Sequence, residues 1–192
     1  MIQWLTPYDG ASDITSYTIK LLGDDGITYY EEKTYCDGSQ AEIMSTRQCT
    51  VPSVIFTQLP YNLKWGSSIY AQIVATNIKG TSSVSESGNG AIILRVPDAP
   101  INLSNVVTLT DFDTIGLTWQ EGPENGGSVV IDYRVKFSTD AVTFTNFETG
   151  ITVLPYQANS LIVGTTYTFK VEARNEFGYS AESSPISILT AE

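Results

Sequence analysis

The sequence predicts an all-β protein made of two consecutive β-sandwiches, and three observations lead to this prediction. Apolar and polar residues alternate with period two along most of the 192 residues, whereas helical periodicity is hard to find. Clusters of Gly, Asn, Asp and Pro separate the alternating runs, as they do at turns between strands. An internal repeat divides the chain into two related units, so one sandwich is expected in each.

The alternation is clearest in residues 167–174. Odd-numbered positions from Tyr167 to Ala173 are apolar, and even-numbered positions from Thr168 to Arg174 are polar or charged. Successive side chains of a strand point to opposite faces of a sheet, so this pattern predicts a strand with one buried face and one solvent face. Residues 130–137 show the same alternation and predict another strand.

The internal repeat relates three segments of the first unit to three segments of the second. The matches are residues 14–21 with 130–137 (offset 116), Trp4 with Trp119 (offset 115) and residues 66–80 with 164–178 (offset 98). Because the offset changes between these matches, the first unit holds 18 extra residues in its middle, and both cysteines lie within that stretch.

The boundary between the units lies at residues 96–100, Val-Pro-Asp-Ala-Pro. Two prolines remove backbone donors and favour an extended, stiff connector. We therefore predict two domains, residues 1–96 and residues 97–192. A short Pro-containing joint restricts the angle between neighbours, whereas a Gly/Ser linker would leave them free, so a semi-rigid rod is expected.

The first unit lacks a counterpart to the beginning of the second. By the tryptophan offset, Met1 corresponds to Gly116, so nothing before it matches residues 97–115. Those residues would form the first strand and the start of the second, and without them part of the core face and one strand edge are exposed. Two explanations stay open: the sequence is an excerpt of a longer chain, or a neighbouring chain donates the strand and builds head-to-tail fibres.

Several motifs of the second unit carry a family resemblance. They are Pro97-Asp98-Ala99-Pro100 with Leu103, Leu117-Thr118-Trp119, residues 123–128, Tyr133-Arg134-Val135, and Gly164-Thr165-Thr166-Tyr167 leading into residues 173–178. Together they resemble a fibronectin type III domain over the whole second unit. The resemblance implies a seven-stranded immunoglobulin-like sandwich in which Trp119 packs in the core and Tyr167 closes a corner of the chain. The predicted fold class is therefore all-β, with two consecutive immunoglobulin-like (fibronectin type III) sandwiches, the first lacking its N-terminal strand.

The first unit resembles the family more loosely. Ile69 stands at the position of Tyr167, so the hydrogen bond from a corner tyrosine to the backbone is expected to be absent there. Cys36 and Cys49, followed by residues 60–66 (Pro-Tyr-Asn-Leu-Lys-Trp-Gly), are similar to repeats in very large surface proteins of ciliated protists.

Cys36 and Cys49 are the only cysteines, and they enclose a polar excursion with little core-forming capacity of its own. We predict a disulfide between them, which would stabilise the first unit by roughly 3 kcal/mol by restricting its unfolded chain. A redox role is disfavoured, because the spacing is not C-x-x-C and no histidine is present to lower a thiol pKa. The pair implies an oxidising compartment, so the predicted location is extracellular or at the cell surface.

Two further features are candidate interaction or modification sites. Asn102 begins the only N-x-S/T triplet and is the predicted glycan acceptor, with Ile101 and Leu103 pointing inward and Asn102 outward. Near the cysteine excursion, Tyr29, Tyr30 and Tyr35 form a candidate contact surface for protein or sugar. The alternative is that Tyr29 or Tyr30 fills the core of the enlarged first sandwich.

The composition argues against metal and nucleic-acid chemistry. The chain has no histidine, and two cysteines cannot supply a four-ligand zinc site. A net charge of −11 disfavours phosphate binding, so no nucleic-acid partner is expected. Asp24-Asp25 and Asp111-x-Asp113 offer oxygen ligands of the kind that calcium prefers, but neither shows several converging carboxylates. We predict solvated loops there, with Asp24-Asp25-Gly26 as a turn, and no metal or cofactor.

No catalytic residues are predicted. Glu121 and Glu124 are paired carboxylates, but they flank a Pro/Gly-rich loop where exposure explains them better than acid/base chemistry. The sequence contains no G-x-S-x-G motif and no phosphate-binding loop. Residues 1–4 lack the features of a signal peptide, and no apolar run approaches the length of a membrane span, so no membrane insertion is expected from this segment.

The predicted function is that of a non-enzymatic extracellular spacer and interaction repeat of a large surface or fibrous protein. Its expected partners are neighbouring repeats of the same chain or identical chains, and other surface proteins or glycans. Two alternatives stay open: a self-assembling fibre subunit completed by a donated strand, and an adhesion or carbohydrate-binding module acting through the three tyrosines. An accessory domain of a carbohydrate-active enzyme is a further possibility.

Overall fold

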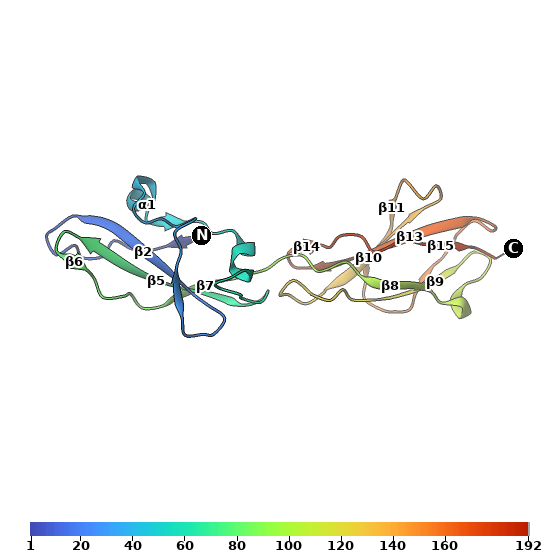
Figure 1. Cartoon of the computed structure of the whole chain (residues 1–192). Helices are drawn as coiled ribbons and strands as arrows, with labels where there is room; N and C mark the ends of the chain where they lie inside the picture. Colours follow the sequence, from blue (N-terminus) through green and yellow to red (C-terminus); the bar gives the residue numbers. More distant parts are fainter. Residues whose placement is uncertain (192) are drawn as a thin grey trace. The chain divides into compact units, whose positions relative to one another are not determined.

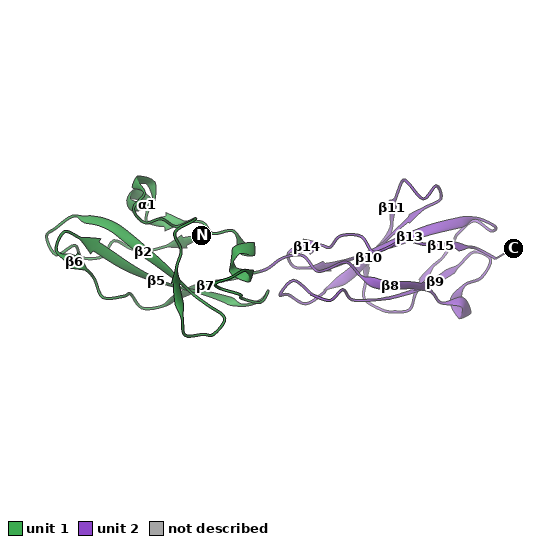
Figure 2. Ribbon diagram, in the orientation of Figure 1, with its two compact units in different colours: residues 1–93 green, residues 94–192 purple. Residues whose placement is uncertain are grey.

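The computed structural model describes residues 1–191 and divides the chain into two compact units, Met1–Ile93 (unit 1) and Leu94–Glu192 (unit 2) (Figures 1 and 2). Both units are built from strands that face each other across an apolar core. The predicted class, two consecutive immunoglobulin-like β-sandwiches of which the first lacks a strand, is confirmed.

Unit 2 forms a sandwich of two antiparallel sheets. Its elements are β8 (Ile101–Asn105), η2 (Val107–Leu109), β9 (Ile115–Gln120), β10 (Asp132–Ser138), β11 (Thr145–Ile151), β12 (Tyr156–Ala158), β13 (Thr166–Asn175), β14 (Gly178–Tyr179) and β15 (Ile186–Leu189). One sheet has the order β12-β9-β8, and the other has the order β11-β10-β13-β14 with β15 also paired to β13. Apolar side chains of both sheets, such as Leu117 and Phe169, are buried in one cluster between them.

The two residues that the family resemblance singles out take their expected places in unit 2. Trp119 is buried in the core and packs edge-on against Tyr133, with ring centroids 5.4 Å apart. The hydroxyl oxygen of Tyr167 accepts a hydrogen bond from the backbone N–H of Ile162, at 3.0 Å. This contact closes the corner before β13, so both roles are confirmed.

The outer face of β13 differs from the expected solvent face. Thr168 and Glu172 are buried along with the core-facing residues of the same strand. The Thr168 hydroxyl lies 2.8 Å from that of Ser187, and the Glu172 carboxylate is paired with Arg134. Polar side chains of the neighbouring strands therefore cover a face that the alternation alone would leave in solvent.

Unit 1 follows the same plan with one sheet reduced. Its elements are β1 (Ile2–Gln3), β2 (Ile14–Leu22), β3 (Tyr29–Glu31), α1 (Ala41–Thr46), β4 (Gln48–Cys49), η1 (Ser53–Thr57), β5 (Ser68–Asn77), β6 (Gly80–Thr81) and β7 (Gly88–Ile92). The larger sheet has the order β3-β2-β5-β6 with β7 also paired to β5, whereas the smaller one contains only β1 and β4. Within residues 1–93, no strand takes the place that β8 has in unit 2.

The reduced sheet leaves the core of unit 1 partly uncovered. Along β5 the apolar side chains from Ile69 to Ala75 are only partly buried, although they match residues of β13 that are fully buried. A groove of about 570 Å³ is lined by Ile69, Ala71 and Ile73 of β5 and by residues of β1, η1 and β7. The exposed core face that the sequence predicts for the first unit is therefore present.

Candidate interaction surfaces

The two cysteines form the predicted disulfide, Cys36–Cys49, with their Cα atoms 5.3 Å apart. The segment between them contributes more to the core than the polar excursion with little core-forming capacity that the sequence suggests. It contains α1, from which Ile43 and Met44 pack against the buried cluster of unit 1. Both cysteines are buried in that same cluster, so the disulfide fastens the helical segment to the core.

The three candidate tyrosines do not form one exposed surface. Tyr30 packs against the core of unit 1 and lies edge-on to Tyr61, with ring centroids 6.1 Å apart, so the core-filling alternative holds for Tyr30. Tyr29 is half-buried, and its hydroxyl lies 2.6 Å from that of Ser87. Tyr35 is 39% exposed. A contact role for Tyr35, beside the disulfide, stays a prediction.

A buried carboxylate close to Tyr35, that of Glu32, was not predicted from the sequence. Glu32 is 5% exposed, and one of its oxygens accepts hydrogen bonds from the backbone N–H groups of Thr34 and Tyr35, at 2.9 and 3.0 Å. The other oxygen accepts the hydroxyl proton of Tyr61 at 2.6 Å. Burial, together with this carboxylate, raises the pKa of Tyr61. One feature of the sequence could have revealed this burial. Glu32 lies two positions after Tyr30, so the alternation of the strand points both side chains to the inner face of the sheet.

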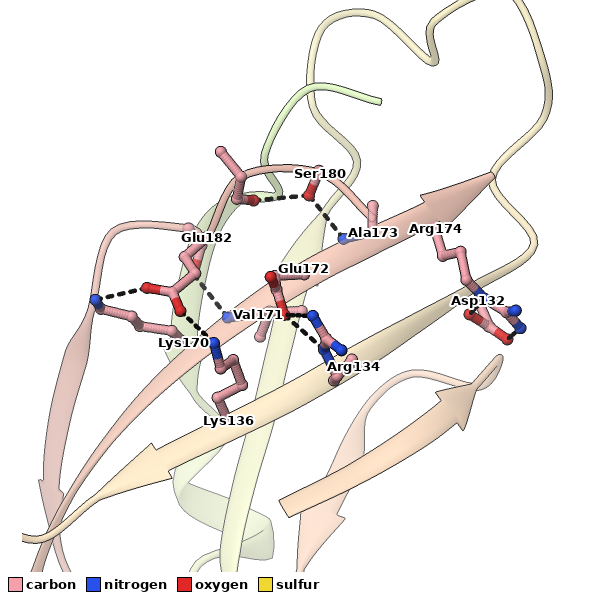
Figure 3. A network of polar contacts seen from close by, with 12 residues as sticks. Asp132, Arg134, Lys136, Lys170, Val171, Glu172, Ala173, Arg174, Ser180 and Glu182 are labelled. Atoms are coloured by element: carbon pink, nitrogen blue, oxygen red, sulfur yellow. Dashed lines mark hydrogen bonds and ion pairs between the residues drawn. The ribbon is translucent and has the colours of Figure 1, made fainter. Parts of the chain in front are cut away.

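All four basic residues of positions 97–192 lie on one face of unit 2, on β10 and β13, and each is paired with a carboxylate (Figure 3). The pairs are Arg134 with Glu172 (2.6 Å), Lys136 with Glu182 (2.5 Å), Lys170 with Glu182 (2.8 Å) and Arg174 with Asp132. We call this set the ion-pair ladder. Its charges are paired with carboxylates of unit 2, so the face presents few free charges to a partner.

Tyr179 and the neighbouring acids hold the ladder in place. The guanidinium carbon of Arg134 lies 3.9 Å from the ring centroid of Tyr179, a cation–π distance. The hydrogen bond from Arg174 lowers the pKa of Asp132, and the hydrogen bonds from Lys136 and Lys170 lower the pKa of Glu182. The ladder is therefore strongest while its carboxylates are ionised.

Serine hydroxyls tie the last segment of each unit to its central strand. In unit 2 the hydroxyl oxygen of Ser180 accepts a hydrogen bond from the N–H of Ala173 (Figure 3), and that of Ser183 accepts one from the N–H of Val171, each at 3.0 Å. In unit 1 the same bonds are made by Ser82 and Ser85 to Ala75 and Ile73, again at 3.0 Å. The offset of 98 relates both pairs, so the repeat could have revealed them from the sequence.

The acidic positions considered for calcium accept hydrogen bonds from neighbouring groups of the protein. Asp25 accepts from the hydroxyl of Thr28 and from the N–H groups of Thr28 and Ile27 at the turn after β2, as expected for Asp24-Asp25-Gly26, and these bonds lower its pKa. Among residues 1–191, no group of three or more Asp, Glu, Cys or His side chains is placed to hold a metal ion. Glu121 and Glu124 are exposed. Burial, together with the nearby charge of Glu121, raises the pKa of Tyr133 to about 12.

The strand that carries Asn102 corrects the predicted alternation. Asn102 is exposed as expected, but Ile101 does not point inward and is 42% exposed. The register of β8 on β9 shifts between Ile101 and Ser104, and Asn102 has a φ of 56°. A bulge at Asn102 therefore rotates Ile101 out of the core, while Leu103 still packs against it.

Comparison with known proteins agrees with this geometry. Residues 98–189, nearly the whole of unit 2, match the family model of the fibronectin type III domain. The chain is similar in structure to a crystal structure of titin domains A168–A170. The superposition covers 92% of this chain and 55% of the titin chain, with a TM-score of 0.54 and 20% sequence identity. This likeness shows the fold of the chain.

Two curated relatives match nearly the whole sequence. Ephrin type-A receptor 3 of Danio rerio is 28% identical over 199 residues, covering 99% of this chain and 19% of that protein. Pikachurin of Rattus norvegicus is 25% identical over 199 residues, covering 98% of this chain and 18% of that protein. The chain thus spans about a fifth of the length of these relatives. No helix among residues 1–191 is both long and apolar enough to cross a membrane.

Proposed function

We propose that this chain is a non-enzymatic, extracellular spacer and interaction segment of a larger surface or fibrous protein, in which two fibronectin type III-like domains follow each other. The observation that carries the proposal is the short joint between the units. A spacer needs consecutive domains whose connection limits their relative motion, and a short joint provides this limit whereas a long flexible linker does not.

The joint is short because Leu94, the first residue of unit 2, lies between two residues whose backbones are each hydrogen-bonded within one unit. On one side, Ile93 is held in unit 1, where its N–H donates to the carbonyl of Ser67 and its carbonyl accepts from Gly66, at 3.1 and 2.8 Å. On the other side, Arg95 is held in unit 2 by hydrogen bonds with Gly126 and Asn175, at 3.0 and 2.8 Å. The backbone on both sides of Leu94 is therefore fixed to a sandwich.

The joint predicts a narrow distribution of distances between the units. Single-molecule energy transfer between dyes on unnatural amino acids at Ile27 and Val142, both 81% exposed, measures this distribution. Inserting five Gly/Ser residues after Leu94 should widen it at least twofold, and the same insertion between Ile78 and Lys79 should leave it unchanged. A native distribution as wide as that of the Leu94 insertion would refute the spacer role.

The proposed extracellular location rests on the disulfide, because such bonds persist in oxidising compartments. A thiol titration of native material under denaturing conditions should find no free thiol. Two free thiols would overturn the location. The narrower likeness to repeats of ciliate surface proteins also stays a proposal.

Asn102 is the proposed glycan acceptor of this segment. Its side chain is exposed, and its Nδ2 donates to Gln120 Oε1 at 2.7 Å. A glycosylated amide keeps one N–H, so this hydrogen bond and a glycan are compatible. Intact-mass spectrometry should show hexose mass on native material and none on Asn102→Gln; unmodified native material would contradict the proposal.

A further inference from the structure

The edge of β1 in unit 1 is open where its counterpart in unit 2 is occupied. In unit 2, β9 lies between β12 and β8. Within residues 1–191, β1 pairs with β4 alone. The pairing of β1 with β4 is equivalent to that of β9 with β12: Ile2 lies opposite Cys49, and Leu117, its counterpart at the tryptophan offset of 115, lies opposite Tyr156. The free edge of β1 is therefore the edge along which β8 pairs with β9.

The segment before β9 shows what occupies this place in unit 2. Arg95 N–H donates to the carbonyl of Gly126 at 3.0 Å, and Asp98 N–H donates to that of Glu124 at 2.8 Å. The chain then enters β8, which runs antiparallel to β9, and Leu103 packs against the core. We call residues 94–105 the leader strand of unit 2.

Glycine is required where the leader strand crosses the loop after β9. A Cβ on Gly126 would lie 2.1 Å from the carbonyl oxygen of Arg95, and Gly126 has a φ of 75°. Its counterpart in unit 1 at the offset of 116 is Gly10, with a φ of 68°. A Cβ on Gly10 would meet no atom within 4 Å, so unit 1 keeps the same crossing point without a strand over it.

The asparagine beside this crossing point is also repeated. Asn175 Nδ2 donates to the carbonyl of Asn125 at 2.9 Å and to that of Arg95, in the leader strand, at 2.8 Å. The counterpart of Asn175 in unit 1 is Asn77. Its Nδ2 donates to the carbonyl of Asp9 at 2.8 Å, as Asn175 does to Asn125, but its other hydrogen bond goes to the carbonyl of Ser12 at 3.2 Å. Gly10 and Asn77 line a hollow of about 260 Å³.

We propose that unit 1 is an acceptor for an extended peptide strand with the chemistry of the leader strand of unit 2. The acceptor surface comprises Gly10, Asn77, the free edge of β1 and the apolar groove beside Ile69, Ala71 and Ile73. The strand crosses Gly10 with its Pro-containing end and runs antiparallel to β1. The residues equivalent to Ser104 and Asn105 lie opposite Gln3 and Ile2, and the equivalent of Leu103 enters the groove.

The inference rests on the proposed repeat architecture, because a segment of a neighbouring repeat that has the chemistry of the leader strand but is not paired within its own sandwich would supply such a strand. Backbone hydrogen bonds along β1 would provide affinity, and the groove would select apolar side chains at alternate positions. The second copy of this chain is a poorer source, because its own leader strand is already paired with β9.

The first test uses the full chain and a fluorescent peptide with the sequence of residues 94–106. Saturable binding by fluorescence anisotropy is expected, and the peptide with Leu103→Asp should bind at least tenfold more weakly. In the protein, Gly10→Asn should weaken binding at least tenfold, since asparagine tolerates a positive φ but its side chain occupies the crossing point. Gly26→Asn is the matched control, because Gly26 has a φ of 69° and also open space around it, and it should bind within twofold of the native chain.

A fusion tests the same site without relying on intermolecular affinity. Residues 94–115 are placed directly before Met1, which restores the spacing found in unit 2. Hydrogen exchange of the β5 amides should then slow at least tenfold. The same fusion carrying Leu103→Asp is the control and should leave the exchange rate unchanged. Failure of both the peptide and the fusion overturns the proposal, and so does sedimentation showing that a second copy covers the groove. Neither failure would alter the distance distribution at Leu94, so the spacer role is tested separately.

Discussion

Replacing Tyr61 with phenylalanine should destabilise unit 1 by removing one buried hydrogen bond. The Tyr61 hydroxyl donates to Glu32 Oε2 at 2.6 Å, and Tyr61 is 2% exposed. Glu32 Oε1 keeps its two backbone donors, from Thr34 and Tyr35, while Oε2 is left without one. Water has little access to replace the lost donor, because both side chains are buried.

The size of the effect follows from the charge on the acceptor. A hydrogen bond to an ionised group contributes about 1.5–3 kcal/mol, so Tyr61→Phe should cost about 2 kcal/mol, or about 30-fold in the unfolding equilibrium constant. Tyr30→Phe is the matched control. The Tyr30 ring packs edge-on to Tyr61, but its hydroxyl makes no hydrogen bond within residues 1–191, so its removal should cost less than about 0.5 kcal/mol.

Hydrogen exchange read by mass spectrometry assigns the loss to unit 1, because peptides from β2 and β5 report it separately from unit 2. A double-mutant cycle with Glu32→Gln isolates the bond, and the double variant should cost clearly less than the sum of the single variants. Equal effects of Tyr61→Phe and Tyr30→Phe, or full additivity with Glu32→Gln, would refute the reasoning.

Three further predictions concern other parts of the structure. Replacing Cys36 and Cys49 together by alanine should lower the stability of unit 1 by about 3 kcal/mol in urea unfolding, with exchange in unit 2 unchanged. Tyr167→Phe should cost unit 2 about 1 kcal/mol, because Ile162 N–H loses its acceptor; unchanged exchange around Ile162 would contradict this. The pKa values of Asp132 and Glu182 are lowered in the folded state, so their stabilisation of unit 2 should be complete above about pH 5 and should be lost as the pH falls below about 4. Glu182→Gln should flatten that pH dependence in urea titrations, and an equally steep profile would count against the ladder.

The sequence predicted the features that depend on local pattern. Alternation from Tyr167 to Ala173 identified a strand because residues two apart share a face in any strand. The two cysteines are the only ones in the chain, so their pairing needed no knowledge of the fold. The corner role of Tyr167 also followed from its motif, since the N–H of Ile162 that donates to its hydroxyl lies only five residues earlier in the chain.

The bulge at Asn102 shows where a local pattern fails. Alternation assumes a regular ladder, and the positive φ of Asn102 breaks it, so Ile101 leaves the core. The prediction that the outer face of β13 is exposed to solvent fails for a different reason. Its charged residues look solvent-facing along the chain, yet Glu172 is buried because Arg134 on β10 reaches it.

By itself, then, the sequence determined the all-β class, the repeat, the disulfide and the missing strand of the first unit, because each is written in spacings along one chain. Only the tertiary structure decided that Glu32 meets Tyr61 across 29 positions. It also decided that four basic side chains share one ladder, and that β1 lines the groove beside Ile69 while Gly10 and Asn77 line a second hollow. These depend on which distant segments the core brings together, and burial then fixes the energy of each contact.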